Sequence, residues 1–184
     1  MASNTRDRMV EGAARLLAEN GLEGTSFSEV LEYTGAPRGS LYHHFPDGKD
    51  EMVASAVDLA GARALTLLES WRGLDAEHVT ANFIGVWRET LTRSDYRVGC
   101  AVLAVTVAID SPQLLSRAAA VFRSWRGGLA ELLSDGGMPD AEQFAALLVA
   151  SCEGAVVMSR AEKSLDGFEA VAARLLRDAR ERRP

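Results

Sequence analysis

Residues 24–45 read GTSFSEVLEYTGAPRGSLYHHF and contain two short helical patterns on either side of a glycine turn. Ser26 is followed three residues later by Glu29, the spacing of a capping box, which predicts that a short helix begins there. The turn at residues 34–37 ends that helix, and its proline is tolerated as the first residue of a third helix, from Arg38 to Phe45. Two short helices joined by a glycine turn are the layout of a helix-turn-helix.

The rest of the chain also shows helical periodicity. Apolar residues at Met9, Ala13, Leu16 and Leu17 predict a first helix that ends at Asn20-Gly21. The valines of residues 98–109 also suit a strand, but no second strand is available to pair with it, so a buried helix is predicted. Further helices are expected over 49–71, around 79–91, after Ser111-Pro112, and over 139–162 and 165–182. The predicted fold is all-α, with a three-helix helix-turn-helix domain at residues 1–50 and a C-terminal helical domain at residues 51–184.

Composition narrows the class of protein. The 184 residues are 47 % apolar and 25 % charged, which is typical of a globular chain, and the net charge of −6 excludes a generally basic nucleic-acid coat protein. Two cysteines are too few for a disulfide scaffold or a zinc cluster. The charged N-terminus, MASNTRDRMVEGAARLL, is unlike a signal peptide, and the longest uncharged run, residues 98–109, is too short to span a bilayer. A cytoplasmic protein with no membrane partner is expected.

The spacing of the short helices alone leaves two readings open, because such helices also occur as simple connectors between longer ones. The amino-acid sequence of residues 24–45, followed by Lys49-Asp50-Glu51, resembles that of the N-terminal domain of the TetR family of transcriptional regulators. The Thr-Ser start, the Thr-Gly turn, the Leu-Tyr-His-His-Phe block and the Lys-Asp-Glu step carry this resemblance. Pro46-Asp47-Gly48-Lys49 and the Gly99-Cys100 step resemble the branch of that family named after LmrA and YxaF.

The resemblance implies a set of residues that contact double-stranded DNA. The start of the second helix would offer a hydroxyl and free backbone N–H groups to a phosphate, and the start of the third helix would reach base edges in the major groove. Leu41, Phe45 and His44 are expected in the core instead, with the His44 ring in a buried hydrogen bond. The expected DNA contacts are Thr25, Ser26, Arg38, Gly39, Ser40, Tyr42, His43 and Lys49.

The charge of this segment opposes strong attraction to DNA. Residues 1–50 carry five Lys or Arg and eight Asp or Glu, a balance of −3. Because phosphate neutralisation supplies much of the affinity for DNA, a shallow salt dependence and a larger share for backbone N–H and hydroxyl contacts are expected.

Other chemistry is not indicated. His43 and His44 point about 100° apart on a helix, and no further ligand follows at metal-binding spacing, so no metal site is expected. Cys100 and Cys152 lie in apolar helices and suit core packing better than a redox pair. Without a nucleophile elbow or a glycine-rich phosphate loop, neither an enzyme nor a cofactor is expected.

The C-terminal two-thirds resembles the family's regulatory domain in architecture only. Apolar stripes on the last two helices suit a four-helix bundle between two copies or, alternatively, an internal core. Apolar residues of the central helices suit a ligand pocket, although core is again the alternative. The predicted dimer residues are Phe144, Leu148, Ser151, Ala155, Met158, Phe168, Val171 and Leu175, and the predicted pocket residues are Phe83, Trp87, Cys100, Leu103, Val107, Phe122 and Trp125.

The resemblance to the TetR family implies a ligand-responsive transcriptional regulator, most simply a repressor. It would bind a palindromic operator as a homodimer and be released by a small-molecule effector. The alternative is a helical protein-interaction module that has lost sequence-specific DNA binding, which the acidic N-terminal segment favours.

Overall fold

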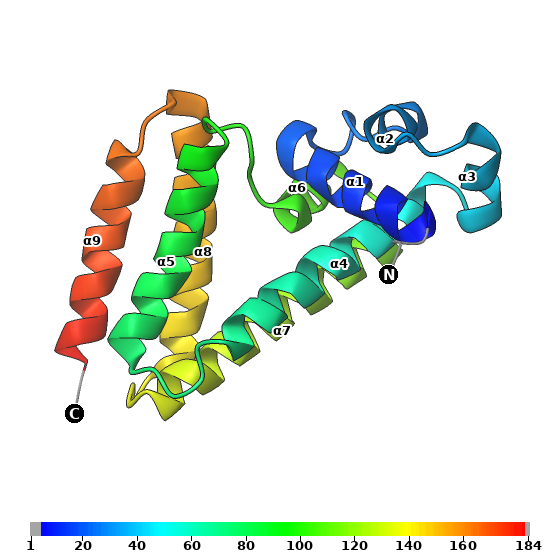
Figure 1. Cartoon of the computed structure of the whole chain (residues 1–184). Helices are drawn as coiled ribbons and strands as arrows, with labels where there is room; N and C mark the ends of the chain where they lie inside the picture. The colour runs from blue at the N-terminus through cyan, green and yellow to red at the C-terminus, as the bar shows by residue number, and fades with distance from the viewer. Residues whose placement is uncertain (1–4, 183–184) are drawn as a thin grey trace. The chain divides into compact units, whose positions relative to one another are not determined.

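The computed structural model describes residues 5–182, and over that range the chain forms nine α-helices and no strand. The predicted all-α class is therefore confirmed. Residues 1–4, which begin the stretch judged for a signal peptide, lie outside the described range. The helices are α1 (Thr5–Asn20), α2 (Phe27–Thr34), α3 (Arg38–His44), α4 (Lys49–Glu69), α5 (Ala76–Arg93), α6 (Ala101–Ala108), α7 (Pro112–Asp135), α8 (Ala141–Glu162) and α9 (Asp166–Glu181) (Figure 1).

Local sequence accounts for the ends of α2. The side chain of Ser26 accepts a hydrogen bond from the backbone N–H of Glu29, and the Glu29 carboxylate accepts one from the backbone N–H of Ser26. The predicted capping box is confirmed. At the other end, Gly35 adopts a left-handed conformation with φ of 65°, and its N–H donates to the Leu31 carbonyl. Glycine suits this turn because a side chain there would strain the backbone.

The helix predicted over residues 98–109 begins later than expected, at Ala101. Asp95 and Tyr96 both have positive φ, and they turn the chain after α5. The Arg160 guanidinium donates to the Arg97 carbonyl at 2.9 Å and holds this turn. Cys100 then serves as the N-cap of α6, with its Sγ accepting from the Leu103 N–H at 3.4 Å.

The chain divides into two compact units. Unit 1 comprises the described residues up to Arg63 together with Cys100–Phe122, and unit 2 comprises Ala64–Gly99 together with the described residues from Arg123 onward. Helices α4 and α7 each contribute to both units. The proposed functional division at residue 50 concerns DNA binding rather than compactness, and it stays a prediction.

In unit 1, α1 packs against α2 and α6. The largest side chains in the core of unit 1 are fully buried or nearly so. Leu41 and Phe45 are among them, as predicted, so the inner face of α3 anchors that short helix. His44 differs from the expectation, because it is only half-buried and its ring lies beside that of His43, with centroids 5.1 Å apart. The core of unit 1 includes Met9, Leu17, Val30, Leu41, Phe45, Met52 and Val53.

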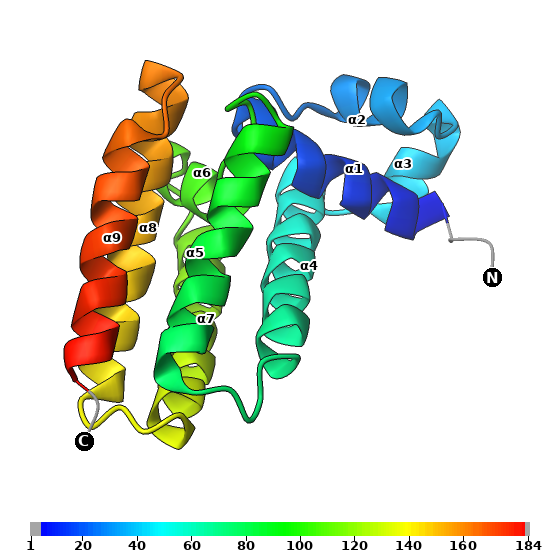
Figure 2. The ribbon, with the colours of Figure 1, turned by 60° about the vertical axis from the view of Figure 1, so that its left-hand side comes forward.

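In unit 2, α5, α8 and α9 run side by side, as Figures 1 and 2 both show, and each packs against the other two. Phe144 and Phe168 fill the interior of this bundle. By length and composition alone, α8 is apolar enough to cross a membrane, but half of its apolar window is buried inside the protein. Its hydropathy reflects a core helix that also exposes apolar side chains on its outer face.

Candidate DNA-binding surface

Thr25 occupies the turn between α1 and α2 and is fully buried. Its hydroxyl donates to the Gly21 carbonyl at 2.7 Å, which ties the turn to the end of α1. A fully buried hydroxyl that already donates to its own chain is not presented to a DNA phosphate. In this structure Thr25 shapes the start of α2 and does not lie on the surface with the other predicted contacts.

Ser26 is half-buried at the N-terminus of α2, and Glu29 engages it twice. The Glu29 Oε2 atom accepts from the Ser26 N–H at 2.6 Å, while the Ser26 Oγ accepts from the Glu29 N–H at 3.2 Å. These hydrogen bonds to Ser26 and the nearby charge of Lys49 hold the pKa of the Glu29 carboxyl below its ordinary value. The carboxylate is therefore charged at neutral pH and occupies a backbone donor that a phosphate would need.

Lys49 begins α4, and its Nζ donates to the Leu22 carbonyl at 2.9 Å. This contact joins the start of α4 to the turn that precedes α2. An ammonium group has three donors, so one bond to a carbonyl leaves others for a phosphate. The predicted anchoring role of Lys49 stays a prediction, with a structural role now established beside it.

The outer face of α3 carries most of the predicted DNA contacts. Arg38, Gly39 and His43 are exposed, and Tyr42 is 75 % exposed. A side chain at Gly39 would meet no atom within 4 Å apart from the adjoining backbone of its own helix, so this position is open to close approach. The Ser40 hydroxyl donates to the Pro37 carbonyl at 2.6 Å, which leaves its lone pairs as acceptors. This exposed part of α3 is called the α3 face below.

Aromatic contacts hold α3 in place. The Tyr42 ring packs edge-on against Phe27 of α2, with centroids 6.3 Å apart. On the other side, the Arg6 guanidinium lies over the Phe45 ring at 5.2 Å and donates to Ser55 Oγ of α4 at 3.0 Å. Sequence reasoning missed Arg6 as a brace, since its spacing from Phe45 and Ser55 along the chain gives no local signal.

Most of the residues predicted at a dimer interface pack inside the protomer. A side chain that fills its own protomer's core has little surface left for a second copy, so the burial of these residues favours the internal-core alternative, and their place at a dimer interface stays a prediction. Ser151 and Val171 are half-buried, and Met158 is 46 % exposed. The buried residues are Phe144, Leu148, Ala155, Phe168 and Leu175.

The opposite side of α8 carries a continuous apolar surface. Leu147 is 43 % exposed and Val157 is 50 % exposed, and small residues lie between them. Leu147, Ala150, Gly154 and Val157 stand three or four residues apart, the spacing of one helical face, and Met158 lies beside Val157. This surface, called the outer α8 stripe, consists of Leu147, Ala150, Gly154, Val157 and Met158.

The predicted pocket residues are divided between the two units. Val107 is 75 % exposed near the end of α6, whereas Cys100 and Trp125 are buried. Phe83, Trp87, Leu103 and Phe122 are half-buried. Cys100, Leu103, Val107 and Phe122 belong to unit 1, and Phe83, Trp87 and Trp125 belong to unit 2. Their assignment to one pocket stays a prediction.

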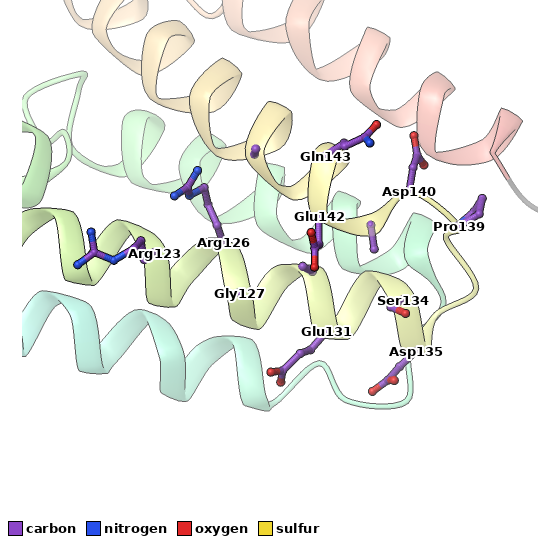
Figure 3. A pocket seen from close by; sticks show the side chains of 13 residues that line it. Arg123, Arg126, Gly127, Glu131, Ser134, Asp135, Pro139, Asp140, Glu142 and Gln143 are labelled. Atoms are coloured by element: carbon purple, nitrogen blue, oxygen red, sulfur yellow. The ribbon is translucent and has the colours of Figure 1, made fainter.

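A different cavity, a groove of about 1000 Å³, lies within unit 2 between α7 and the start of α8. Figure 3 shows Arg123 and Arg126 toward one end of it and Glu131 and Asp135 toward the other. This charged, open groove is unlike the apolar pocket predicted from the central helices.

A short helix with an exposed polar face, braced by a capped second helix and a longer first one, defines a helix-turn-helix transcriptional regulator. Comparison with known proteins supports this class of protein. A profile described as bacterial regulatory proteins of the tetR family matches residues 9–56. A second, described as the C-terminal domain of LmrA/YxaF-like transcriptional regulators, matches residues 76–174. The chain belongs to the TetR family of transcriptional regulators.

Individual proteins support this assignment. An uncharacterised helix-turn-helix transcriptional regulator of Mycobacterium tuberculosis strain H37Rv is 36 % identical over 179 residues, covering 90 % of this chain and 89 % of the relative. The transcriptional repressor AcnR of Corynebacterium glutamicum is 37 % identical over 68 residues, which cover 37 % of this chain and 36 % of AcnR. The crystal structure of a transcriptional regulator from Rhodococcus sp. Rha1 has a TM-score of 0.76 at 30 % identity, covering 97 % of this chain and 96 % of that one.

Proposed function

We propose that this regulator is a repressor that binds a palindromic operator as a homodimer and leaves it when a small molecule binds. The observation that carries the proposal is the α3 face, where Arg38, Gly39, Tyr42 and His43 are exposed on a helix of seven residues. Such a helix is slim enough to enter a major groove. An arginine at its start has the geometry for two hydrogen bonds to guanine. Repression is favoured because AcnR, a relative over about a third of the chain, is named a repressor.

The outer α8 stripe is the surface that we assign to the second copy. In a two-fold dimer the same patch meets itself, and small residues such as Ala150 and Gly154 let two helices approach closely. Leu147 and Val157, at 43 % and 50 % exposure, lie on the same face and would lose water-exposed apolar area on assembly. Dimerisation places two α3 helices at a fixed separation, which a palindromic site requires.

Release by an effector requires two conformations with different affinities for DNA. A ligand can shift their balance only as far as it binds one of them more tightly. Helices α4 and α7 each run through both compact units, so a ligand held by one unit has a continuous helical connection to the other. We place the protein in the cytoplasm, with no enzymatic activity and no membrane partner.

The test is binding of the purified protein to the DNA upstream of its own gene, measured by fluorescence anisotropy with competitor DNA. If that DNA gives no signal, a genome-wide selection of bound fragments follows. Tyr42→Ala should weaken specific binding by about tenfold or more, since the proposed contact with a DNA phosphate and the packing of the Tyr42 ring on Phe27 are lost together. Tyr33→Ala is the matched control, because Tyr33 is 57 % exposed on α2 and is not a predicted DNA contact. Equal affinity of both variants for DNA would overturn the proposed contact surface.

The second candidate, a protein-interaction module, rests on the acidic balance of residues 1–50, five basic against eight acidic residues. The two functions separate in the same assays. A regulator selects specific fragments from the genome and loses them in Tyr42→Ala, whereas an interaction module selects none and is indifferent to the substitution.

A further inference from the structure

We propose that Glu29 limits the affinity of this protein for the DNA backbone and thereby makes binding more dependent on base contacts. The proposal rests on the proposed DNA-binding function and adds a residue that neither the sequence pattern nor the family assignment marks as functional. Glu29 lies at the third position of α2 and interacts with two groups expected to meet phosphate, with the Ser26 backbone through a hydrogen bond and with Lys49 through its charge.

The hydrogen bonds of Glu29 set this arrangement. Its Oε2 atom lies 2.6 Å from the Ser26 nitrogen, so the backbone donor at the start of α2 already has an anionic acceptor from the same chain. The Ser26 hydroxyl is also engaged, because it accepts from the Glu29 N–H at 3.2 Å. A phosphate that approaches Ser26 therefore has to displace this carboxylate or remain beside it.

Lys49 provides the second, independent observation. Its Nζ donates to the Leu22 carbonyl at 2.9 Å, which holds the cation beside the turn that precedes α2, and its positive charge helps to lower the pKa of Glu29. Glu29 thus reduces the attraction of both groups to a phosphate. The same carboxylate stabilises α2 through the capping box, so the interaction that fixes the helix also weakens the phosphate contact.

A substitution separates the two effects. Glu29→Gln keeps an acceptor for the Ser26 N–H and removes the charge, because Gln serves in capping boxes as Glu does. Coulomb's law for a unit charge about 5 Å from a phosphate in water predicts roughly a fourfold gain in affinity for each protomer, and over tenfold for a dimer that carries two. Glu32→Gln is the matched control, since Glu32 is exposed on the same helix and its removal changes net charge equally.

The experiment compares the wild type, Glu29→Gln and Glu32→Gln on operator and random DNA by anisotropy across a salt series. Glu29→Gln should bind both DNAs over tenfold more tightly at low salt and show a steeper salt dependence, because the phosphate contact is common to operator and random DNA. A purely structural cap predicts no gain for Glu29→Gln, and a general charge effect predicts equal gains for both variants. Either result overturns the proposal.

A second measurement does not need an operator. Inorganic phosphate is titrated into ¹⁵N-labelled wild type and Glu29→Gln while the amide signals of residues 26–29 are followed. Saturable shifts in the variant at lower phosphate than in the wild type support the proposal, and identical titrations refute it. If the wild type selects no DNA from the genome, the proposed function fails, while the phosphate titration still decides the role of Glu29.

Discussion

Replacement of Thr25 by valine tests whether its hydroxyl serves the fold or the DNA. Valine has the same shape, so the main loss is the 2.7 Å hydrogen bond from the Thr25 hydroxyl to the Gly21 carbonyl. Such a bond contributes about 1 kcal/mol, and about 3 kcal/mol when the abandoned partner stays dry. Gly21 is half-exposed, so water can reach its carbonyl and we expect the lower figure, about 1 kcal/mol per protomer. With a urea slope of about 2 kcal/mol/M, the unfolding midpoint falls by about 0.5 M.

Affinity for DNA supplies the contrast. A protein with a typical stability of about 5–15 kcal/mol remains folded after this loss, so Thr25→Val should bind DNA within about twofold of the wild type. Thr25→Ser is the control, because it keeps the hydroxyl and loses a buried methyl group, at a similar cost of about 1 kcal/mol. If Thr25→Val binds about tenfold more weakly while Thr25→Ser binds normally, the hydroxyl contacts DNA and the structural assignment is refuted. Urea midpoints are compared at one protein concentration, since the proposed dimerisation would contribute to them.

Three further predictions concern the turn, the dimer and a buried thiol. Gly35→Ala should destabilise the protein by about 1 kcal/mol in urea unfolding. The cost is conformational, because φ at Gly35 is 65° and no neighbouring atom lies within 4 Å of the added Cβ. A loss above about 3 kcal/mol would indicate a steric clash instead. Val157→Glu should weaken the proposed dimer at least about tenfold in analytical ultracentrifugation, because it puts a charge in the outer α8 stripe. Leu67→Glu, at an exposed position of α4, should leave the dimer unchanged. Equal effects of the two substitutions would contradict the assigned interface. Burial raises the pKa of the Cys152 thiol to about 12, helped by the charge of Glu153. In the Cys100→Ser variant, where Cys152 is the remaining cysteine, the thiol should therefore react with a thiol reagent at pH 8 only after unfolding. Rapid reaction of the native variant would contradict that burial.

Helix positions were predictable from sequence because their signals are local. The capping box at Ser26 and the glycine at residue 35 bound α2, and both operate within a few residues. The turn before α6 was missed because one contact that holds it is distant in the sequence: Arg160 of α8 donates to the Arg97 carbonyl, 63 positions away. The bracing of Phe45 by Arg6 escaped prediction for the same reason.

The faces of α8 were harder to predict than its existence. This helix is apolar on nearly all sides, so a periodic stripe can be drawn on either side and the sequence does not say which one is buried. Phe144 and Leu148 face the protomer's own core, which the packing of α5 and α9 decides. The small residues Ala150 and Gly154 lie on the exposed side of α8, which is the side that we propose for the second copy.

The acidic balance of residues 1–50 is compatible with DNA binding once the partners of the charges are known. Glu11 pairs with Arg63 and Glu19 with Arg15, so these carboxylates are partly neutralised by ion pairs within unit 1. The sequence of α3, RGSLYHH, contains no acidic residue. The helix expected to enter the groove therefore contributes no negative charge of its own, while Glu29 keeps its charge beside the proposed phosphate contacts. An operator complex of this kind would draw its affinity from bases and hydrogen bonds more than from net charge, and its salt dependence should be shallow.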